Sequence, residues 1–275
     1  MKFNIIVDSA SNISPNVLSN DNIEIKVASL ILNVDGTEFV DDANIDTHAM
    51  LTSIKKSKKP RSSCPSPYSF YSLIEEDKYN IIITMSSKLS GSYNSANTAI
   101  SMLEKTDNVF LMDSKFVAGV MRLIVERAVN DINSGASFEE IKEDLIKYRD
   151  SLNLLFVLDK FDTLVKNGRV SKIIAKIASL VAIKPICAGV DGEIKMTQKI
   201  RTFDGAIKKL ANMVIEKIKT SKVTKVIISH TENLVAALKV KELVNKVFKN
   251  VQIQIEENKG LCSFYSMTGG LIVSF

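Results

Sequence analysis

Short apolar runs alternate with amphipathic segments along most of the chain. Residues 3–7, 80–84 and 154–158 are short, largely aliphatic runs of the kind that form buried strands. Apolar residues recur at helical spacing over 96–103 and 117–129, which predicts helices with a buried face. Further strands are predicted at 225–229, 251–255 and 271–275, with a helix over 234–243 between the first two. This alternation predicts an α/β protein.

Two Asp-Gly pairs predict hairpin turns. Asp35-Gly36 follows a strand predicted at 25–34 and leads into TEFV, and Asp191-Gly192 follows a strand predicted at 183–190 and leads into EIKM. Such pairs suit tight turns because glycine adopts a positive φ without a steric penalty. The sequence therefore predicts antiparallel pairing at two places in addition to the parallel strands.

Cap and breaker residues set the ends of further elements. Ser137 and Glu140 predict a capping box at a helix start, and Asp204 predicts the cap of a helix over 206–214. Another helix is predicted over 171–182. The prolines within 60–67 predict an exposed loop with several hydroxyl groups.

Small hydroxyl residues gather directly after three of the predicted strands. Residues 8–12 read DSASN, residues 86–92 read SSKLSGS, and Asp113-Ser114 follow a third apolar run. The carboxyl ends of parallel strands meet at one edge of a sheet, so we expect these loops to line one crevice. Hydroxyls and helix-start amides hold a small anionic group such as a carboxylate without a metal or a reactive base.

Length and composition predict two domains. With 275 residues and 30.4 kDa, the chain is near the size at which one core divides into two. The segment after 154–158 is poorer in serine and richer in lysine and arginine than the part before it. We expect an N-terminal α/β domain over 1–150, which carries the serine-rich loops, and a C-terminal α/β domain over 151–275.

Cysteine usage and the N-terminal segment predict a cytoplasmic protein. Cys64, Cys187 and Cys262 are odd in number and form no CxxC pair, which argues against a disulfide framework and a zinc site. Cys187 and Cys262 lie in apolar contexts typical of core residues. The first residues, MKFNIIVD, lack the pattern of a secretory signal, and no apolar run approaches the ~20 residues that span a bilayer.

The formal net charge of +5 is mild and does not imply a nucleic-acid partner. The densest basic patch comprises Lys55, Lys56, Lys58, Lys59 and Arg61, and no aromatic residue that could stack on a base interleaves it. Two interpretations stay open for this patch. It is either a solvated helix end or a contact for an acidic partner or an anionic membrane surface.

Histidine and glycine patterns argue against several classes of enzyme. The chain has two histidines. His48 lies in a predicted exposed helix, and His230 ends a predicted strand, where it serves either in ligand contact or catalysis or in a structural hydrogen bond. The GxSxG signature of α/β-hydrolases is absent. The glycine patterns of dinucleotide and nucleoside triphosphate sites are absent as well, so the sequence does not predict ATP binding.

Asp8 and Asp113 have two interpretations. They form either a paired carboxylate site at one sheet edge or separate caps of the turns that follow their strands. The positive charges of Arg169 and Lys184 add to the same crevice if they lie near it, and are otherwise surface residues.

An ordered set of motifs resembles the DegV family of bacterial fatty-acid-binding proteins. The motifs are IIVDSASNIS, RSSCPSP, ITMSSKLSGSYNSA, VFLMDSKFVAG, TLVKNGRVS, AIKPI and MTGGLIVSF, and together they cover the chain from end to end. This resemblance implies a two-domain fold, with a Rossmann-like parallel-sheet domain followed by an α/β domain with a mixed sheet.

The resemblance also implies a function. Such proteins bury the acyl chain of one long-chain fatty acid and present its carboxylate to a separate ATP-dependent fatty acid kinase, which makes an acyl phosphate. The protein would then be a carrier without catalytic residues, cofactor or metal. An acyl chain of about 15 methylenes, at ~0.8 kcal/mol each, contributes on the order of 12 kcal/mol before the costs of binding are subtracted.

The resemblance assigns candidate site residues by motif position. Ser62 and Ser63 match a pair near the carboxylate, Ser90 matches the serine of the SG segment, and Arg169 matches an arginine implicated in the region that meets the kinase. Tyr265 occupies the place of a family histidine and can donate a hydrogen bond to a carboxylate, but it cannot become cationic. Asn12 stands where aspartate is frequent.

Two further functions are compatible with the sequence. One is a small-molecule kinase or phosphotransfer subunit that uses Asp8 or Asp113. The other is a lipid-independent regulatory module that uses the basic patch from Lys55 to Arg61.

Overall fold

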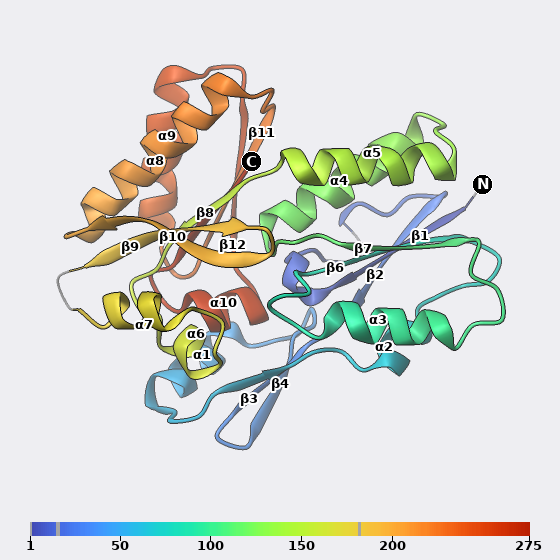
Figure 1. The fold of residues 1–275 in the computed structure, drawn as a ribbon, viewed down its shortest axis with the longest axis horizontal. Coiled ribbons are helices and arrows are strands. Elements are labelled where there is room, and N and C mark those ends of the chain that lie inside the picture. The colour runs from blue at the N-terminus through green and yellow to red at the C-terminus, as the bar shows by residue number, and fades with distance from the viewer. Residues whose placement is uncertain (1, 15–16, 181–182) are drawn as a thin grey trace.

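The computed structural model describes residues 2–14, 17–180 and 183–275 and shows two layered α/β units side by side (Figure 1). The first unit is built on a four-stranded parallel sheet of order β2-β1-β6-β7. Its strands are β1 (Phe3–Asp8), β2 (Ile23–Ala28), β6 (Tyr79–Thr84) and β7 (Val109–Asp113). The predicted Rossmann-like parallel sheet is confirmed.

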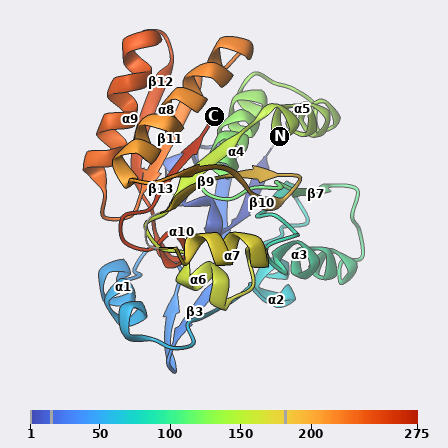
Figure 2. The ribbon, with the colours of Figure 1, turned by 60° about the vertical axis from the view of Figure 1, so that its left-hand side comes forward.

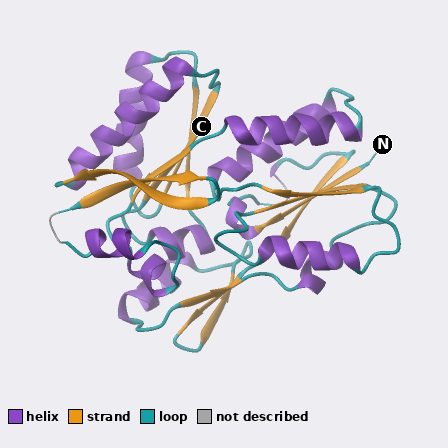
Figure 3. Ribbon diagram, viewed as in Figure 1, coloured by secondary structure: helices purple, strands orange, loops and turns teal. Residues whose placement is uncertain are grey.

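Helices cover both faces of this sheet (Figure 3). The helices α2 (Pro67–Tyr71) and α3 (Ser92–Ser101) lie on one face, and α4 (Gly119–Asn133) and α5 (Phe138–Ser151) lie on the other. Alternate residues of β1 therefore pack on different helices: Ile6 belongs to the cluster with α3, and Ile5 belongs to the cluster with α4. Burial on both faces explains the unbroken apolar runs. The capping box at Ser137 is confirmed.

The second unit contains a mixed six-stranded sheet of order β10-β9-β8-β13-β11-β12. Its strands are β8 (Leu154–Val157), β9 (Lys184–Val190), β10 (Glu193–Ile200), β11 (Lys225–His230), β12 (Gln252–Glu257) and β13 (Leu271–Ser274). Only the β11–β12 pair is parallel among its pairings, so the expected mixed sheet is confirmed. The helices of this unit are α6 (Asp162–Lys166), α7 (Lys172–Ala178), α8 (Phe203–Thr220), α9 (Leu234–Val247) and α10 (Gly260–Ser266).

A small antiparallel sheet corrects the prediction of one strand over 25–34. The chain leaves the parallel sheet after β2 and forms β3 (Ile31–Val34), which pairs with β4 (Thr37–Val40) through the predicted turn at Asp35-Gly36. The break occurs at Leu30, whose N–H donates to Ser9 Oγ at 3.0 Å and whose carbonyl accepts from Asp41 N at 2.9 Å. These bonds occupy the backbone groups that a continuous strand would use for pairing.

Three other local predictions are also corrected. The expected loop over 60–67 contains β5 (Arg61–Ser63), which pairs with β3 because that strand has a free edge. The cap of α8 is Thr202, whose extended backbone lets its hydroxyl accept from Gly205 N, whereas Asp204 lies inside the first turn. The helix predicted over 171–182 ends at Ala178, and residues 181–182 lie outside the described residues.

Elements from both halves of the chain meet around α10. Figure 2 shows α6 and α7 in front of α10, with α1 (Thr47–Lys56) and β3 close by. The main apolar cluster includes residues from Phe3 to Ile272, so the core itself is continuous between the halves. The division into 1–150 and 151–275 stays a prediction.

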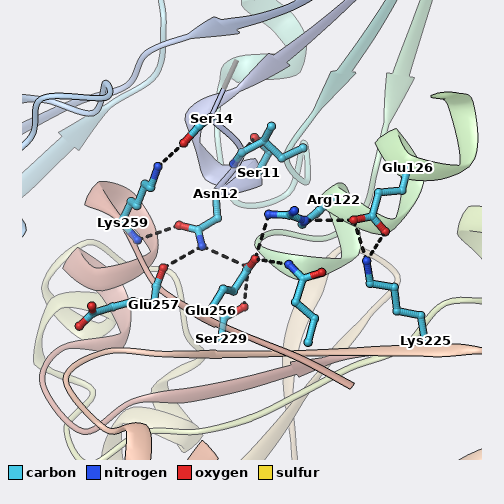
Figure 4. Close-up of polar contacts among 12 residues, drawn as sticks. Ser11, Asn12, Ser14, Arg122, Glu126, Lys225, Ser229, Glu256, Glu257 and Lys259 are labelled. Atoms are coloured by element: carbon cyan, nitrogen blue, oxygen red, sulfur yellow. Dashed lines mark hydrogen bonds and ion pairs between the residues drawn. The ribbon is translucent and has the colours of Figure 1, made fainter. Parts of the chain in front are cut away.

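A polar network ties the loop after β1 to the second unit (Figure 4). Asn12 Nδ2 donates to Glu256 Oε1 and to the carbonyl of Glu257, both at 3.1 Å, and Asn12 Oδ1 accepts from Lys259 N at 2.7 Å. Arg122 on α4 lies 3.3 Å from the other carboxylate oxygen of Glu256. The side chain at position 12 therefore acts as donor and acceptor at once, which an aspartate cannot do when ionised.

No helix among the described residues has the length and apolar character needed to cross a bilayer.

Candidate functional site

The hydroxyl-rich loops lie where a doubly wound sheet binds its ligands. Because β2 lies on one side of β1 and β6 lies on the other, the chain reverses its winding between β1 and β6. The loops after β1, β6 and β7 leave the same edge of the sheet, as the parallel registers require. Proteins with such folds bind their ligands in the crevice at this edge of the sheet. The three loops share one edge, as predicted, but the expectation that all three line one crevice is wrong, because residues 8–12 and Asp113-Ser114 line neither of the two spaces described below.

A polar pocket of about 290 Å³ opens at this edge. Its walls bring together the five candidate residues that the family resemblance assigned: Ser62, Ser63, Ser90, Arg169 and Tyr265. They come from β5, the loop before α3, the loop after α6, and α10. Leu30, Cys64, Met85, Leu89, Gly91 and Leu261 complete the lining.

Tyr265 is the centre of the polar contacts on one side of this pocket. Its hydroxyl lies 2.6 Å from Ser62 Oγ and also interacts with the Arg169 guanidinium. Burial raises the pKa of the Tyr265 phenol, so the group stays a neutral donor. Arg169 Nη1 also donates to the carbonyl of Asn167 at 2.9 Å, which holds the guanidinium at the pocket.

Ser90 faces the pocket from the other side, just before α3. Its Oγ lies 3.0 Å from Ser92 Oγ and accepts from Ser92 N at 3.2 Å. The pocket thus combines neutral hydroxyls with one guanidinium, a set of donors suited to an anion such as a carboxylate.

An apolar channel continues inward from the polar pocket. The two spaces share Met85, Leu89, Arg169, Leu261 and Tyr265. The rest of the channel is lined by Lys115, Phe116, Val117, Leu154, Phe156, Leu158, Leu164, Gly189, Gly192, Glu193, Ile194, Cys262, Ser266 and Ile272. The cavity volume of this channel is about 90 Å³, against about 290 Å³ for the polar pocket. The channel is therefore narrow and suits a slender apolar chain.

The β9–β10 hairpin forms part of the channel wall. Gly189 leaves room for Phe116, because a Cβ at Gly189 would lie 3.0 Å from the Phe116 ring. At the tip of the hairpin, Ser86 Oγ donates to the carbonyl of Gly192 at 2.6 Å. Residues of both halves thus enclose the channel. Phe116 and Gly189 were not predicted as site residues, since only their position in the fold relates them to the channel.

Asp8 and Asp113 do not form a carboxylate pair, because β6 lies between their strands. Asp8 accepts from Met85 N at 2.8 Å and from Ala10 N at 3.2 Å, and Asp113 accepts from Ser87 and Lys115. Burial raises the pKa of Asp8 to about 7. The interpretation as caps is the correct one, although Asp8 is more than a cap, since it also fixes the backbone of Met85.

His48, His230 and Lys184 line neither of the two spaces. His48 is exposed and pairs with Glu232 at 2.8 Å, and His230 Nδ1 accepts from Asn233 N, which fits a structural role. Lys184 pairs with Asp159 and lines neither space. Cys187 and Cys262 are buried, as predicted. Within the described residues, no cluster of His, Cys, Asp or Glu could hold a metal ion.

Comparison with known proteins decides the family. A family model described as "Uncharacterised protein, DegV family" matches residues 2–274 of the chain. The chain belongs to the DegV family. A DegV domain-containing protein of Streptococcus pyogenes is 34% identical over 283 residues, which cover 100% of this chain and 99% of that relative.

Solved structures of DegV proteins share the fold. The Fatty Acid Kinase (Fak) B3 protein of Streptococcus pneumoniae, loaded with linoleic acid, has a TM-score of 0.92 and 30% identity over 100% of this chain and 99% of that one. A DegV family protein of Eubacterium eligens, loaded with heptadecanoic acid, has a TM-score of 0.90 and 28% identity, covering 99% of this chain and 98% of that one. These neighbours bind fatty acids.

Proposed function

We propose that this DegV protein binds one long-chain fatty acid, with the acyl chain in the apolar channel and the carboxylate in the polar pocket. The observation that carries the proposal is the continuity of the two spaces, which share Arg169 and Tyr265 at their junction. A ligand with one anionic end and one slender apolar end matches this arrangement. The bound fatty acids of related DegV structures support the same assignment.

The apolar channel and the polar pocket are expected to contribute differently to binding. Burial of each methylene contributes about 0.8 kcal/mol, so the channel supplies most of the affinity. Ser62, Ser63, Ser90 and Tyr265 are proposed to hold the carboxylate by hydrogen bonds, with Arg169 as the charged partner. These groups orient the head group without forming a covalent bond to it.

We further propose that the carboxylate is presented to a separate ATP-dependent kinase, which forms an acyl phosphate. The chain lacks the glycine-rich patterns that hold the phosphates of ATP, and its neighbour from Streptococcus pneumoniae is a protein of a fatty acid kinase. Arg169 and the basic patch from Lys55 to Arg61, which immediately precedes Ser62, are proposed as the contact for that partner. The protein is then a carrier, and catalysis belongs to the kinase.

Native purification followed by mass spectrometry of the extracted lipid tests the ligand. We expect one fatty acid per protein, and saturable binding after delipidation. Absence of any acyl chain together with absence of saturable binding would contradict the proposal. Titration calorimetry with ATP and magnesium separates the carrier from a small-molecule kinase, since the carrier is expected to give no nucleotide heat.

A double variant tests the head-group assignment. Ser63→Ala with Ser90→Ala is expected to weaken fatty acid binding on the order of tenfold or more, because two hydrogen bonds to a charged group are lost. Ser134→Ala with Ser221→Ala is the matched control, because both hydroxyls are exposed and bond only to the preceding helix turn. Equal fatty acid affinities of the two double variants would contradict the assignment of Ser63 and Ser90 to the head group.

A further inference from the structure

The helix α10 carries residues of both spaces but has no cap of its own. Leu261 and Tyr265 line the polar pocket and the apolar channel, and they lie four residues apart on the same face of the helix. The first N–H groups of a helix need acceptors outside the helix, and the side chain of the preceding residue often supplies one. That residue is Lys259, whose side chain makes no such bond.

Asp41, 220 residues before Leu261 in the chain, supplies the missing acceptor. Its Oδ2 accepts from Leu261 N at 2.9 Å. The residue is only 3% exposed, so water cannot readily take the place of its carboxylate. A negative charge at the start of a helix also interacts favourably with the helix dipole. Asp41 therefore caps α10 from the other half of the chain.

The carboxylate of Asp41 is held tightly against the start of α10. A Cβ at Gly260 would lie 1.8 Å from Asp41 Oδ1, so a side chain at residue 260 would displace the carboxylate. On the other side, Asp41 N donates to the carbonyl of Leu30 at 2.9 Å, and Leu30 lines the polar pocket. Asp41 thus fixes the first turn of α10 relative to a wall of the pocket.

The position of α10 decides whether Tyr265 reaches the head group. The phenol of Tyr265 lies 2.6 Å from Ser62 Oγ across the pocket, and hydrogen bonds weaken steeply with distance and misalignment. A shift or rotation of α10 would move this phenol together with the first turn. Asn12 and Ala10 also contact this end of the helix, but Asp41 bonds the residue on the same face as Tyr265.

We propose that Asp41 is a positioning residue for Tyr265, which holds the first turn of α10 so that the phenol can donate to the carboxylate of the fatty acid. This inference rests on the proposed function, and it adds a residue outside both spaces that controls recognition of the head group. Asp41 lines neither space and acts through α10.

The affinities of the delipidated protein for oleate and for oleyl alcohol at pH 7.5 test this role. Asp41→Ala removes the acceptor of Leu261 N. We expect about fivefold weaker binding of oleate, as for loss of one hydrogen bond to the ligand, and a smaller change for oleyl alcohol, whose neutral head group forms a weaker bond with the phenol. A structural defect without a role in head-group recognition would weaken both ligands equally.

Two further variants of the same region serve as controls. Asp41→Asn keeps an oxygen that can accept from Leu261 N, and it is expected to keep the affinity for oleate. Asp42→Ala removes the neighbouring carboxylate, which is exposed and accepts from Asn44 N, and it is expected to change neither affinity.

A double-mutant cycle shows whether Asp41 acts through Tyr265. In the background of Tyr265→Phe, Asp41→Ala is expected to cause no further loss of oleate affinity, because the hydroxyl that it positions is already absent. Gly260→Ala breaks the same contact from the side of the helix, since its methyl group would occupy the place of the carboxylate, and is expected to give the same selective loss. Circular dichroism checks the folding of each variant.

The outcomes distinguish this inference from the proposed function. Unchanged oleate affinity of Asp41→Ala, equal losses for oleate and oleyl alcohol, a loss in Asp41→Asn as large as in Asp41→Ala, or additive effects of Asp41→Ala and Tyr265→Phe would each overturn the inference and leave the proposed function standing. The same holds if neither Asp41→Ala nor Gly260→Ala folds, because the contact then serves folding alone. Absence of saturable oleate binding by the unmodified protein would overturn both.

Discussion

The Ser86 hydroxyl donates a hydrogen bond of 2.6 Å to the carbonyl oxygen of Gly192, 106 residues further along the chain. This bond joins the loop after β6 to the tip of the β9–β10 hairpin. Gly192 has a φ of +83°, and a Cβ at this position would lie 2.8 Å from Ser86 Oγ. A side chain at residue 192 would therefore displace the Ser86 hydroxyl and disturb this bond.

Gly192→Ala is predicted to loosen the hairpin and to accelerate fatty acid release. Gly36→Ala is a matched control, because Gly36 lies in the same kind of Asp-Gly turn at a φ of +93° but a Cβ there meets nothing within 4 Å. Both variants carry about 1 kcal/mol of backbone strain. Only Gly192→Ala also disturbs Ser86. Stopped-flow release of a fluorescent fatty acid compares them, and equal release rates would show that the hairpin does not enclose the ligand.

Gly189→Ala is predicted to shorten the preferred acyl chain. Its new methyl group would lie 3.0 Å from the Phe116 ring and push that ring into the channel. Each methylene that no longer fits costs about 0.8 kcal/mol. Competition between C14 and C18 fatty acids measures the change, and Phe116→Leu in the same variant is expected to restore the original preference. An unchanged preference in Gly189→Ala would place the end of the channel elsewhere.

Tyr265→Phe is predicted to weaken fatty acid binding by about 1 kcal/mol, roughly fivefold, because it removes the hydroxyl that contacts Ser62 and Arg169. The ring and its edge contact with Phe264 are kept, so stability is expected to change little. Tyr68→Phe is the control, since Tyr68 is exposed on α2. Displacement of a fluorescent fatty acid gives the affinities. If both variants bind equally well, the phenol has no part in head-group recognition.

Asp41 is predicted to make stability depend on pH. Burial raises its pKa to about 6, although Leu261 N, Ser9 and Lys259 oppose the shift. The native state therefore binds more protons than the unfolded state between about pH 4 and pH 6, and the contribution of Asp41 to stability is greatest below this window and falls as the pH rises through it. The shift from 3.8 to about 6 corresponds to a loss on the order of 3 kcal/mol.

Urea denaturation of the protein and of Asp41→Asn at pH 4.5 and pH 7.5 checks this sign. Other carboxylates, such as Glu75 beside Lys26 and Lys78, have lowered pKa values and add stability as the pH rises. The difference between the unfolding free energies of the two proteins isolates the contribution of Asp41. This difference should change in favour of Asp41→Asn at the higher pH. A change in the opposite direction would contradict the raised pKa of Asp41.

Asn12→Asp is predicted to destabilise the contact between the two units. The backbone of residue 12 is left-handed at φ 61°, a conformation that both asparagine and aspartate adopt. Aspartate would replace the donor to Glu256 with a second carboxylate, at a cost of about 2 kcal/mol. Urea denaturation measures the loss at neutral pH. Adding Glu256→Gln should recover part of this loss, because the amide of glutamine can donate to the carboxylate introduced at position 12. If the effects of the two substitutions on the unfolding free energy simply add, the two side chains are not directly coupled.

Local patterns in the sequence were sufficient for most of the elements. The apolar runs of β1 and β6, the two Asp-Gly turns and the capping box at Ser137 each depend on residues close together in the chain. The break at Leu30 and the pairing of β5 with β3 were missed because they depend on other segments of the chain, and the cap of α8 was missed because two local solutions were available. Thr202 and Asp204 can both cap a helix, and the conformation of the backbone decides between them.

The sequence by itself determined the class of fold, the edge of the sheet where the hydroxyl groups gather, and the family to which the chain belongs. Its motifs also named Ser62, Ser90, Arg169 and Tyr265, but as separate segments. Only the tertiary structure decided that these segments enclose one pocket and that this pocket adjoins an apolar channel. The physical reason is that periodicity and capping reflect contacts between neighbours in the chain, whereas a pocket depends on how distant segments pack.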